Sequence, residues 1–290
     1  MIPGWRRFMF GMVLLSLLAA AAPRAGAETA PPPVSGPIRL GLLPSIATLS
    51  LLRLYDPLRH HLEEALGRPV ELYTAANFHS HLEAIRDGDF DLLLTAPHFG
   101  VLAYDRGYVP LFRYNQELTP LVVVPKGSAV REPGQLRGRR VVTADRLAAL
   151  SVVAEAWLKI DFGLRADVDY RLEEVASHAT SVRAVAIGDA DAAISSPSVL
   201  QQLPEELRDR VVPFTSRLRM PHQMYLVHPR LGEETIRAVR QALGGVGETE
   251  RGRAFFKSGG FKGLVPVEIA DIEQARPYAD LVSIKNRSGN

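Results

Sequence analysis

Hydroxyl and imidazole side chains gather at four places in this chain, each directly after a short run of strand-like apolar residues. Such groups hydrogen-bond to anions, and a neutral imidazole can also bind a metal ion. Parallel strands end at the same edge of a sheet, so we expect these side chains to border one cleft. The candidates, with one aromatic neighbour, are Ser45, Thr95, His98, Phe99, Ser177, His178, Thr180, Ser195 and Ser196. For each serine and threonine the alternative interpretation is a helix cap.

A further candidate, at a fifth place in the chain, is Arg146, which follows a strand-like run at 141–143. A guanidinium binds a carboxylate or phosphonate through two hydrogen bonds, so Arg146 could hold an anion, and a local ion pair is the alternative. The aromatic residues Phe78, Phe99 and Tyr225 could form the apolar wall of a pocket. For at least two of them we expect packing in the core instead.

The composition excludes several classes of protein. The chain has 290 residues, of which 47% are hydrophobic and 23% charged, values typical of a globular protein with a full core. It has no cysteine, which excludes disulfides, thiolate metal sites and thiol nucleophiles. It also lacks the G-x-S-x-G, P-loop and H-E-x-x-H motifs, and we expect neither an enzyme nor a bound cofactor.

The charge balance gives no reason to expect nucleic acid as a partner. The chain carries 34 basic and 32 acidic residues, but Arg6, Arg7 and Arg24 belong to the first 27 residues, which contain no acid. Without that segment the count is 31 basic against 32 acidic. A protein that binds nucleic acid usually has a marked basic excess, which the rest of this chain lacks.

Residues 1–27 follow the pattern of a secretory signal peptide. The pair Arg6 and Arg7 precedes an uncharged apolar stretch at 8–22, and Ala25-Gly26-Ala27 matches a cleavage site. The stretch is short for a membrane span, which needs about 20 residues, although an uncleaved anchor is the alternative. Residues 28–37 are rich in proline and are expected to form an extended tether. We therefore expect an exported, periplasmic protein; the arginine pair leaves the export route open.

From residue 38 onward, short apolar strands alternate with amphipathic helical stretches. This pattern predicts an α/β fold with mainly parallel sheets and helices on both faces. Two sets of units suggest two lobes, the first formed by 38–120 and 228–290 and the second by 121–227. The apolar runs 121–124 and 224–227 are expected to cross between the lobes as a hinge.

Several segments resemble the periplasmic substrate-binding proteins of ABC importers, in particular the phosphate/phosphite/phosphonate group. The resemblance covers about residues 38–260 and implies the two-lobe type 2 binding-protein fold. Its clearest segment is Ser177-His178-Ala179-Thr180-Ser181 followed by the run 184–193, which ends in Gly188-Asp189-Ala190-Asp191-Ala192-Ala193. Weaker matches are Tyr55-Asp56-Pro57-Leu58, Gly88-Asp89-Phe90-Asp91 and Leu136-Arg137-Gly138.

The resemblance implies roles for particular residues. It places ligand contacts at His178 and at the His222-Gln223 pair, and with His98 the two histidines could converge on an anion or a metal ion. Phosphonate binders of this group carry serine and threonine just after the strand that opens the second lobe. Here that place reads Leu147-Ala148-Ala149-Leu150-Ser151, so Ser151 alone carries a hydroxyl. The phosphonate ligand therefore does not follow from the resemblance.

These observations predict a receptor that binds a small solute, by resemblance an anion, and delivers it to the membrane permease of an ABC importer. Two alternatives keep the same candidate residues. The protein could present its ligand to a membrane sensor such as a histidine kinase, or it could bind a metal ion through His98, His178 and His222.

Overall fold

The computed structural model describes residues 36–288. The predicted signal peptide, and all but the last two residues of the predicted tether, lie outside this range. None of the helices within it has both the length and the apolar character that a membrane span requires.

The first sheet has six strands. Its spatial order is β13 (Leu264–Pro266), β4 (Val109–Tyr114), β12 (Met224–Val227), β3 (Leu92–Thr95), β1 (Ile38–Leu42) and β2 (Val70–Thr74). β1 pairs in parallel with both β2 and β3, whereas β12 is antiparallel to β3 and β4. The parallel part therefore directs the ends of β1, β2 and β3 toward one edge.

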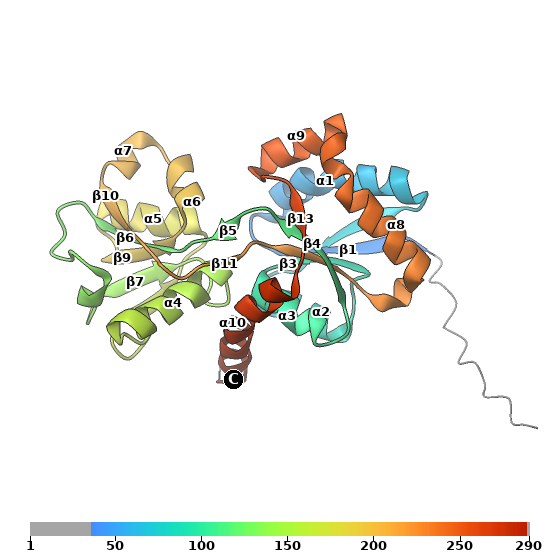
Figure 1. Ribbon diagram of the computed structural model, residues 1–290. Helices are drawn as coiled ribbons and strands as arrows, with labels where there is room; N and C mark the ends of the chain where they lie inside the picture. The colour runs from blue at the N-terminus through green and yellow to red at the C-terminus, as the bar shows by residue number, and fades with distance from the viewer. Residues whose placement is uncertain (1–35, 289–290) are drawn as a thin grey trace, which may run out of the picture. The chain divides into compact units, whose positions relative to one another are not determined.

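Helices cover both faces of this sheet (Figure 1). Leu92 and Leu94 pack with one set of helices, and Leu93 packs with the other, because successive side chains of a strand point to opposite faces. The first set is α1 (Thr48–Leu66), α8 (Gly232–Gly244) and α9 (Glu250–Gly259). The second set is α2 (Phe78–Asp87), α3 (Pro97–Tyr104) and α10 (Ile269–Ser288).

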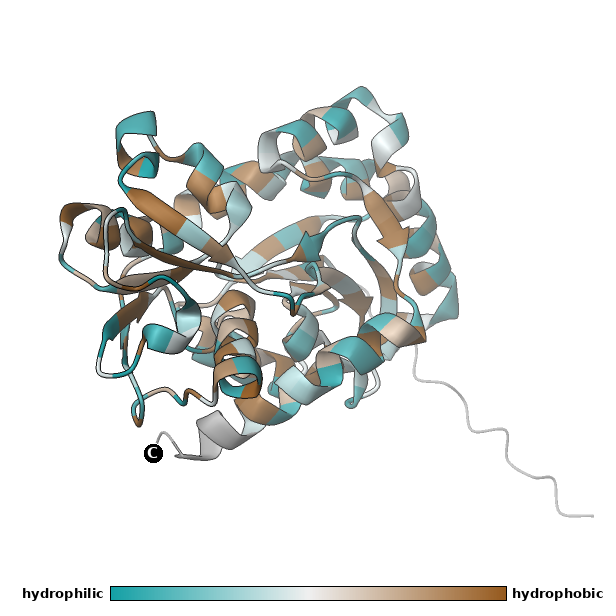
Figure 2. Cartoon of the chain, turned by 60° about the vertical axis from the view of Figure 1, so that its left-hand side comes forward, coloured by the Kyte–Doolittle hydropathy of each residue, from teal (hydrophilic) through white to brown (hydrophobic). Residues whose placement is uncertain are grey.

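The second sheet has five strands and the same layered plan. Its order is β10 (Val211–Thr215), β6 (Leu121–Pro125), β9 (Ala192–Ser195), β7 (Arg140–Thr143) and β8 (Arg171–Glu174). One face is covered by α4 (Ala149–Phe162) and the other by α5 (His178–Ile187), α6 (Pro197–Gln202) and α7 (Glu205–Arg208) (Figure 1). The brown apolar segments of Figure 2 gather on the strands, where β6 and β9 are almost wholly buried. The predicted α/β fold with two lobes is confirmed.

The segments that join the two sheets differ from the prediction. Residues 121–125 belong wholly to the second sheet as β6, and 224–227 belong wholly to the first as β12. The connecting segments are instead β5 (Glu117–Leu118) and β11 (Met220–Pro221), which pair with each other in an antiparallel ribbon. Strongly apolar runs favour central strands of a sheet. The runs 121–124 and 224–227 therefore lie within the two sheets and do not connect the lobes.

Helix α10 does not follow from the sequence pattern. Pro277 lies inside this helix and weakened the helical pattern, since proline removes a backbone donor. The helix is stabilised by packing instead, with Ile272, Ala275, Ala279 and Val282 buried against the core beside α3. Tertiary packing outweighs local propensity here.

Candidate functional site

A cavity of about 710 Å³ lies where the N-termini of helices α1 to α5 come together. These helices follow the parallel strands β1, β2, β3, β7 and β8, so their first residues occupy the edge where such sheets bind ligands. The polar lining residues are Ser45, Thr48, Asn77, Asp145, Ser177, His178, His222 and Gln223. The apolar lining residues include Leu43, Ile46, Phe78, Leu118, Leu150 and a set of alanines.

The helix ends at the cavity differ in how they are capped. The Asn77 side chain accepts a hydrogen bond from the Ser80 N–H (2.8 Å) at the start of α2, and Ser177 accepts one from Thr180 (3.1 Å) at the start of α5. The N-cap residues of α1, α3 and α4 are alanines, which have no side-chain acceptor. These three are Ala47, Ala96 and Ala148, and all of them line the cavity.

Uncapped helix ends are suited to binding an anion. The first N–H groups of a helix have no acceptor within the helix, and the macrodipole places a partial positive charge of roughly half a unit there. In α3 the first residue is Pro97, which has no N–H to offer. The first-turn residues that line the cavity at the other two ends are Thr48 of α1 and Ala149 and Leu150 of α4. The side-chain caps of α2 and α5 each occupy one backbone N–H, whereas no side chain accepts from the first N–H groups of α1 and α4.

Five of the predicted site residues line the cavity: Ser45, Ser177, His178, His222 and Gln223. Of these, Ser177 is also the N-cap of α5, which is the alternative interpretation that the sequence left open for it. The structure thus brings together residues from loops that are far apart in the sequence.

The two histidines at the cavity are neutral groups. His178 places Nδ1 3.3 Å from the Ile194 carbonyl, and because a carbonyl only accepts, Nδ1 carries the proton and Nε2 is left as an acceptor. Burial lowers the pKa of His178, and it lowers the pKa of His222 to about 4. The buried Nδ1 of His222 has no hydrogen-bond partner among the described residues. Neither ring supplies a positive charge at neutral pH.

Three predicted residues at the end of β3 and just after it lie away from the cavity lining. Thr95 is buried, with Oγ1 3.0 Å from His81 Nε2. His98 is buried as well, and its Nε2 donates to the Leu147 carbonyl at 2.9 Å. Phe99 is fully buried in the core, as is Tyr225, whereas Phe78 lines the cavity. Core packing of two of the three aromatic residues is what we expected.

The remaining hydroxyls serve local structure. Thr180 is exposed on the first turn of α5, with Oγ1 2.9 Å from Ser177 Oγ. Ser196 caps α6 by accepting from the Val199 N–H at 3.4 Å, and Ser195 is buried in β9. None of the three is part of the cavity lining. The alternative interpretation as a cap describes Ser196, whose oxygen is used within its own helix end.

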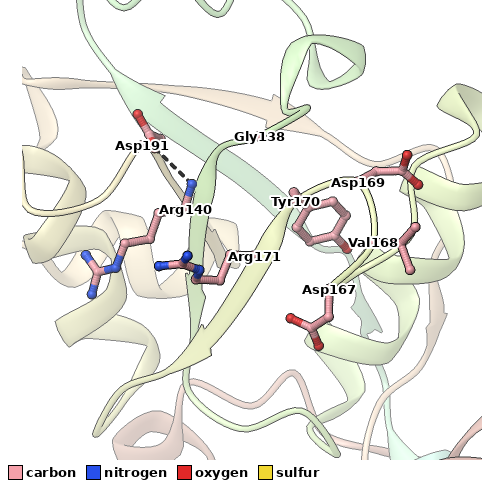
Figure 3. A pocket seen from close by; sticks show the side chains of 8 residues that line it. All are labelled: Gly138, Arg140, Asp167, Val168, Asp169, Tyr170, Arg171 and Asp191. Carbon is pink, nitrogen blue, oxygen red and sulfur yellow. Dashed lines mark hydrogen bonds between the residues drawn. The ribbon is translucent and has the colours of Figure 1, made fainter.

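Arg146 also lies outside the lining. Its guanidinium forms an ion pair with Asp167 and donates to the Leu172 carbonyl, and the hydrogen bond that it donates to the Asp167 carboxylate raises the pKa of Arg146. Asp167 is drawn in Figure 3 beside a second hollow at the outer edge of β7 and β8. At that hollow the Arg140 guanidinium pairs with Glu173, and the Asp191 carboxylate accepts a hydrogen bond from the Arg140 backbone N–H. Arg146 is therefore held by a local ion pair, the alternative that the sequence left open.

The segment without the usual hydroxyls lines the cavity through Ala148, Ala149 and Leu150. The one hydroxyl that remains, Ser151, is fully buried and bonds to Thr143 Oγ1 and to the Asp145 carbonyl, each at 2.6 Å. It offers nothing to a ligand. Sequence reasoning did not select Thr48, Asn77 or Asp145 as lining residues; their place at or beside a helix start after a strand was the available signal.

The three histidines of the metal hypothesis are not brought together. His178 and His222 line the cavity, but His98 bonds to Leu147 outside the lining. Within residues 36–288 there is no group of three histidine, aspartate or glutamate side chains arranged to hold a metal ion. The described residues therefore give no geometric support to the metal-binding alternative.

Comparison with solved structures shows the same fold. PhnD1 from Prochlorococcus marinus, solved with methylphosphonate, has a TM-score of 0.72 at 14% identity, covering 87% of this chain and 98% of its own. XAC2383 from Xanthomonas citri, solved with ATP, has a TM-score of 0.74 at 15% identity, with 88% and 99% covered. The aliphatic sulphonate-binding protein SsuA from Escherichia coli has a TM-score of 0.61 at 16% identity, with 88% and 94% covered.

A sequence model of one family matches residues 40–272, which is most of the chain. Its description is "ABC transporter, phosphonate, periplasmic substrate-binding protein". The match spans both sheets and every loop that lines the cavity. The chain belongs to this family of periplasmic substrate-binding proteins of phosphonate ABC transporters.

Proposed function

We propose that this substrate-binding protein holds a small anion in the 710 Å³ cavity, with the negative group at the N-termini of α1 and α4. The observation that carries the proposal is the pair of alanine N-caps, Ala47 and Ala148, which leave the first N–H groups of both helices without a side-chain acceptor. A helix end of this kind is an anion site because its N–H groups and its dipole act together.

Neutral side chains would complete the binding. Ser45 and Gln223 offer donors at the cavity, and the unpartnered Nδ1 of His222 offers a further polar atom. Binding through neutral donors and helix ends has a physical advantage, because no counter-charge has to be separated when the solute is released.

The test removes one backbone donor from α1. Thr48 is the first residue of the helix, where proline is tolerated. The preceding residue, Ala47, has φ −51° and ψ 133°, a backbone conformation allowed for a residue before proline. We expect Thr48→Pro to weaken binding of methylphosphonate by roughly 10- to 150-fold, since a hydrogen bond to a charged group contributes about 1.5–3 kcal/mol. Isothermal titration calorimetry would measure the change.

Two controls accompany this variant. Thr48→Ala removes the hydroxyl but keeps the N–H, and Glu250→Pro places proline at the first position of α9, away from the cavity. Both should bind as the wild type does. Equal affinity of Thr48→Pro and wild type for every anion that binds would contradict the proposal.

We also propose that residues 1–27 are a cleaved signal peptide. A second proposal is that the two lobes move about the β5–β11 ribbon. The lobe boundaries then lie near residues 118 and 222 instead of the expected 120 and 228. The first is supported by the arginine pair and the Ala25-Gly26-Ala27 site, and the second by the ribbon being the paired connection between the sheets. A mature protein that begins at Glu28 would support the cleavage. A smaller radius of gyration with ligand would support the movement.

A further inference from the structure

The charged side chains around the cavity indicate which kind of anion it binds. This inference rests on the proposed function. No lysine or arginine is among the described residues that line it, and Arg146 is paired with Asp167 elsewhere. The carboxylate of Asp145 lines the cavity and accepts a hydrogen bond from the Leu147 N–H at 2.6 Å. Helix ends supply only fractional positive charge. Because the cost of desolvating an ion rises steeply with its charge, this lining suits one negative charge better than two.

The apolar part of the lining points to a second property of the ligand. Ile46, Phe78, Leu118 and Leu150 present hydrocarbon to the cavity, together with Ala148 and Ala149, where the resemblance led us to look for hydroxyls. A cavity of about 710 Å³ is within the range that holds drug-sized molecules. A bare oxyanion would leave this apolar surface in contact with water, which is unfavourable in proportion to its area.

We propose that the ligand is a singly charged oxyanion with an apolar arm. Its charged head lies at the N-termini of α1 and α4, and its arm packs against Ile46, Leu118 and Leu150. The apolar segment 148–150 thus changes the specificity of the site from a compact, highly charged oxyanion to an amphiphilic one.

The first experiment measures affinity by calorimetry with two matched series. In alkanesulfonates from methyl to hexyl, all single anions, affinity should rise about fourfold per methylene, the equivalent of ~0.8 kcal/mol. Butylphosphonate should bind at least tenfold more tightly at pH 6, as a monoanion, than at pH 9, as a dianion. Butanesulfonate keeps its charge over this range and corrects for any effect of pH on the protein.

The outcomes separate this inference from the proposed function. If inorganic phosphate or methylphosphonate binds more tightly than its butyl analogue, and Thr48→Pro weakens that binding, the anion site stands and the apolar arm is wrong. A preference for the dianion overturns the inference in the same way. If no anion of either series binds, the proposed function falls and this inference falls with it.

A pair of variants tests where the arm lies. Ile46 is 48% exposed and lines the cavity, whereas Leu49 is 60% exposed and does not, so serine at either position leaves the core intact. Ile46→Ser should lower the affinity for hexanesulfonate by about tenfold and leave methanesulfonate unchanged, and Leu49→Ser should change neither. If the affinity of Ile46→Ser still rises by the wild-type factor for each added methylene, the placement of the arm is wrong.

Discussion

At the scale of single residues, the partners of a side chain decide its role more than its type does. Arg146 has the charge to bind an anion, yet Asp167 and the Leu172 carbonyl occupy its guanidinium. His178 could be a cation, but burial lowers its pKa and the Ile194 carbonyl holds its Nδ1 proton. The site therefore has polar groups without full positive charges, and any anion must be bound by dipoles and hydrogen bonds.

His222 allows a prediction about pH. Burial lowers its pKa in the folded protein from 6.5 to about 4, so as the pH falls the unfolded chain binds the proton first. Stability is then lost as the pH falls from about 6.5 to about 4, and it is fully present above 6.5. His222→Gln removes this proton uptake, so its free energy of unfolding should fall less over that range than that of the wild type.

Urea denaturation at a series of pH values between 7 and 4 would compare the two proteins. The difference between them isolates His222 from carboxylates and other histidines that titrate in both. Parallel curves for wild type and variant would show that burial does not shift this pKa as described.

At the scale of elements, the helix starts divide into two kinds. α2 and α5 begin with Asn77 and Ser177, whose side chains satisfy a backbone N–H of their own helix. α1 and α4 begin with alanines that cannot do so. A good cap stabilises a helix, so the alanines cost the fold stability and leave the donors available to a ligand.

This division predicts that better caps will weaken binding. Ala47→Ser and Ala47→Asp should each raise the free energy of unfolding by about 0.5–2 kcal/mol, because either side chain can accept from the first turn of α1. Both should bind anions more weakly than wild type. The aspartate should have the larger effect, since its carboxylate also repels the ligand.

Chemical denaturation and calorimetry on the same samples would check this pair. Because the variants are expected to be more stable, a loss of affinity cannot arise from unfolding. Unchanged affinity in Ala47→Asp would mean that the start of α1 takes no part in binding.

At the scale of the whole molecule, the cavity is lined by helices from both lobes. The chain passes between the two sheets through β5 and β11, which pair with each other. A ligand seated there contacts both lobes at once. Its binding free energy therefore adds to the stability of the folded protein as a unit.

Thermal unfolding would show this coupling. At about 100 times its Kd, a ligand stabilises the fold by roughly 2.7 kcal/mol, which corresponds to a rise in Tm of roughly 5–10 °C for a domain of this size. Hexanesulfonate should produce the rise in wild type, and Thr48→Pro should show a smaller one at the same concentration. A flat Tm in wild type at a ligand concentration where calorimetry detects binding would contradict coupling between the lobes.

Local patterns in the sequence determined much of this protein. The alternation of strands and helices predicted the α/β lobes, and Ser177 was recognisable as a possible helix cap because a cap bonds only three residues away. The same order of segments carried the resemblance to the family that matches residues 40–272.

The tertiary structure alone decided which candidates share the cavity. The partners of Arg146 and His98 lie 21 and 49 residues away in sequence, and no local pattern identifies such contacts. The joining segments β5 and β11 are only two residues each, too short to show a periodicity, and α10 depends on packing against α3 to form despite Pro277. Long-range pairing and burial set these features, because the free energy that stabilises them comes from contacts that exist only in the folded chain.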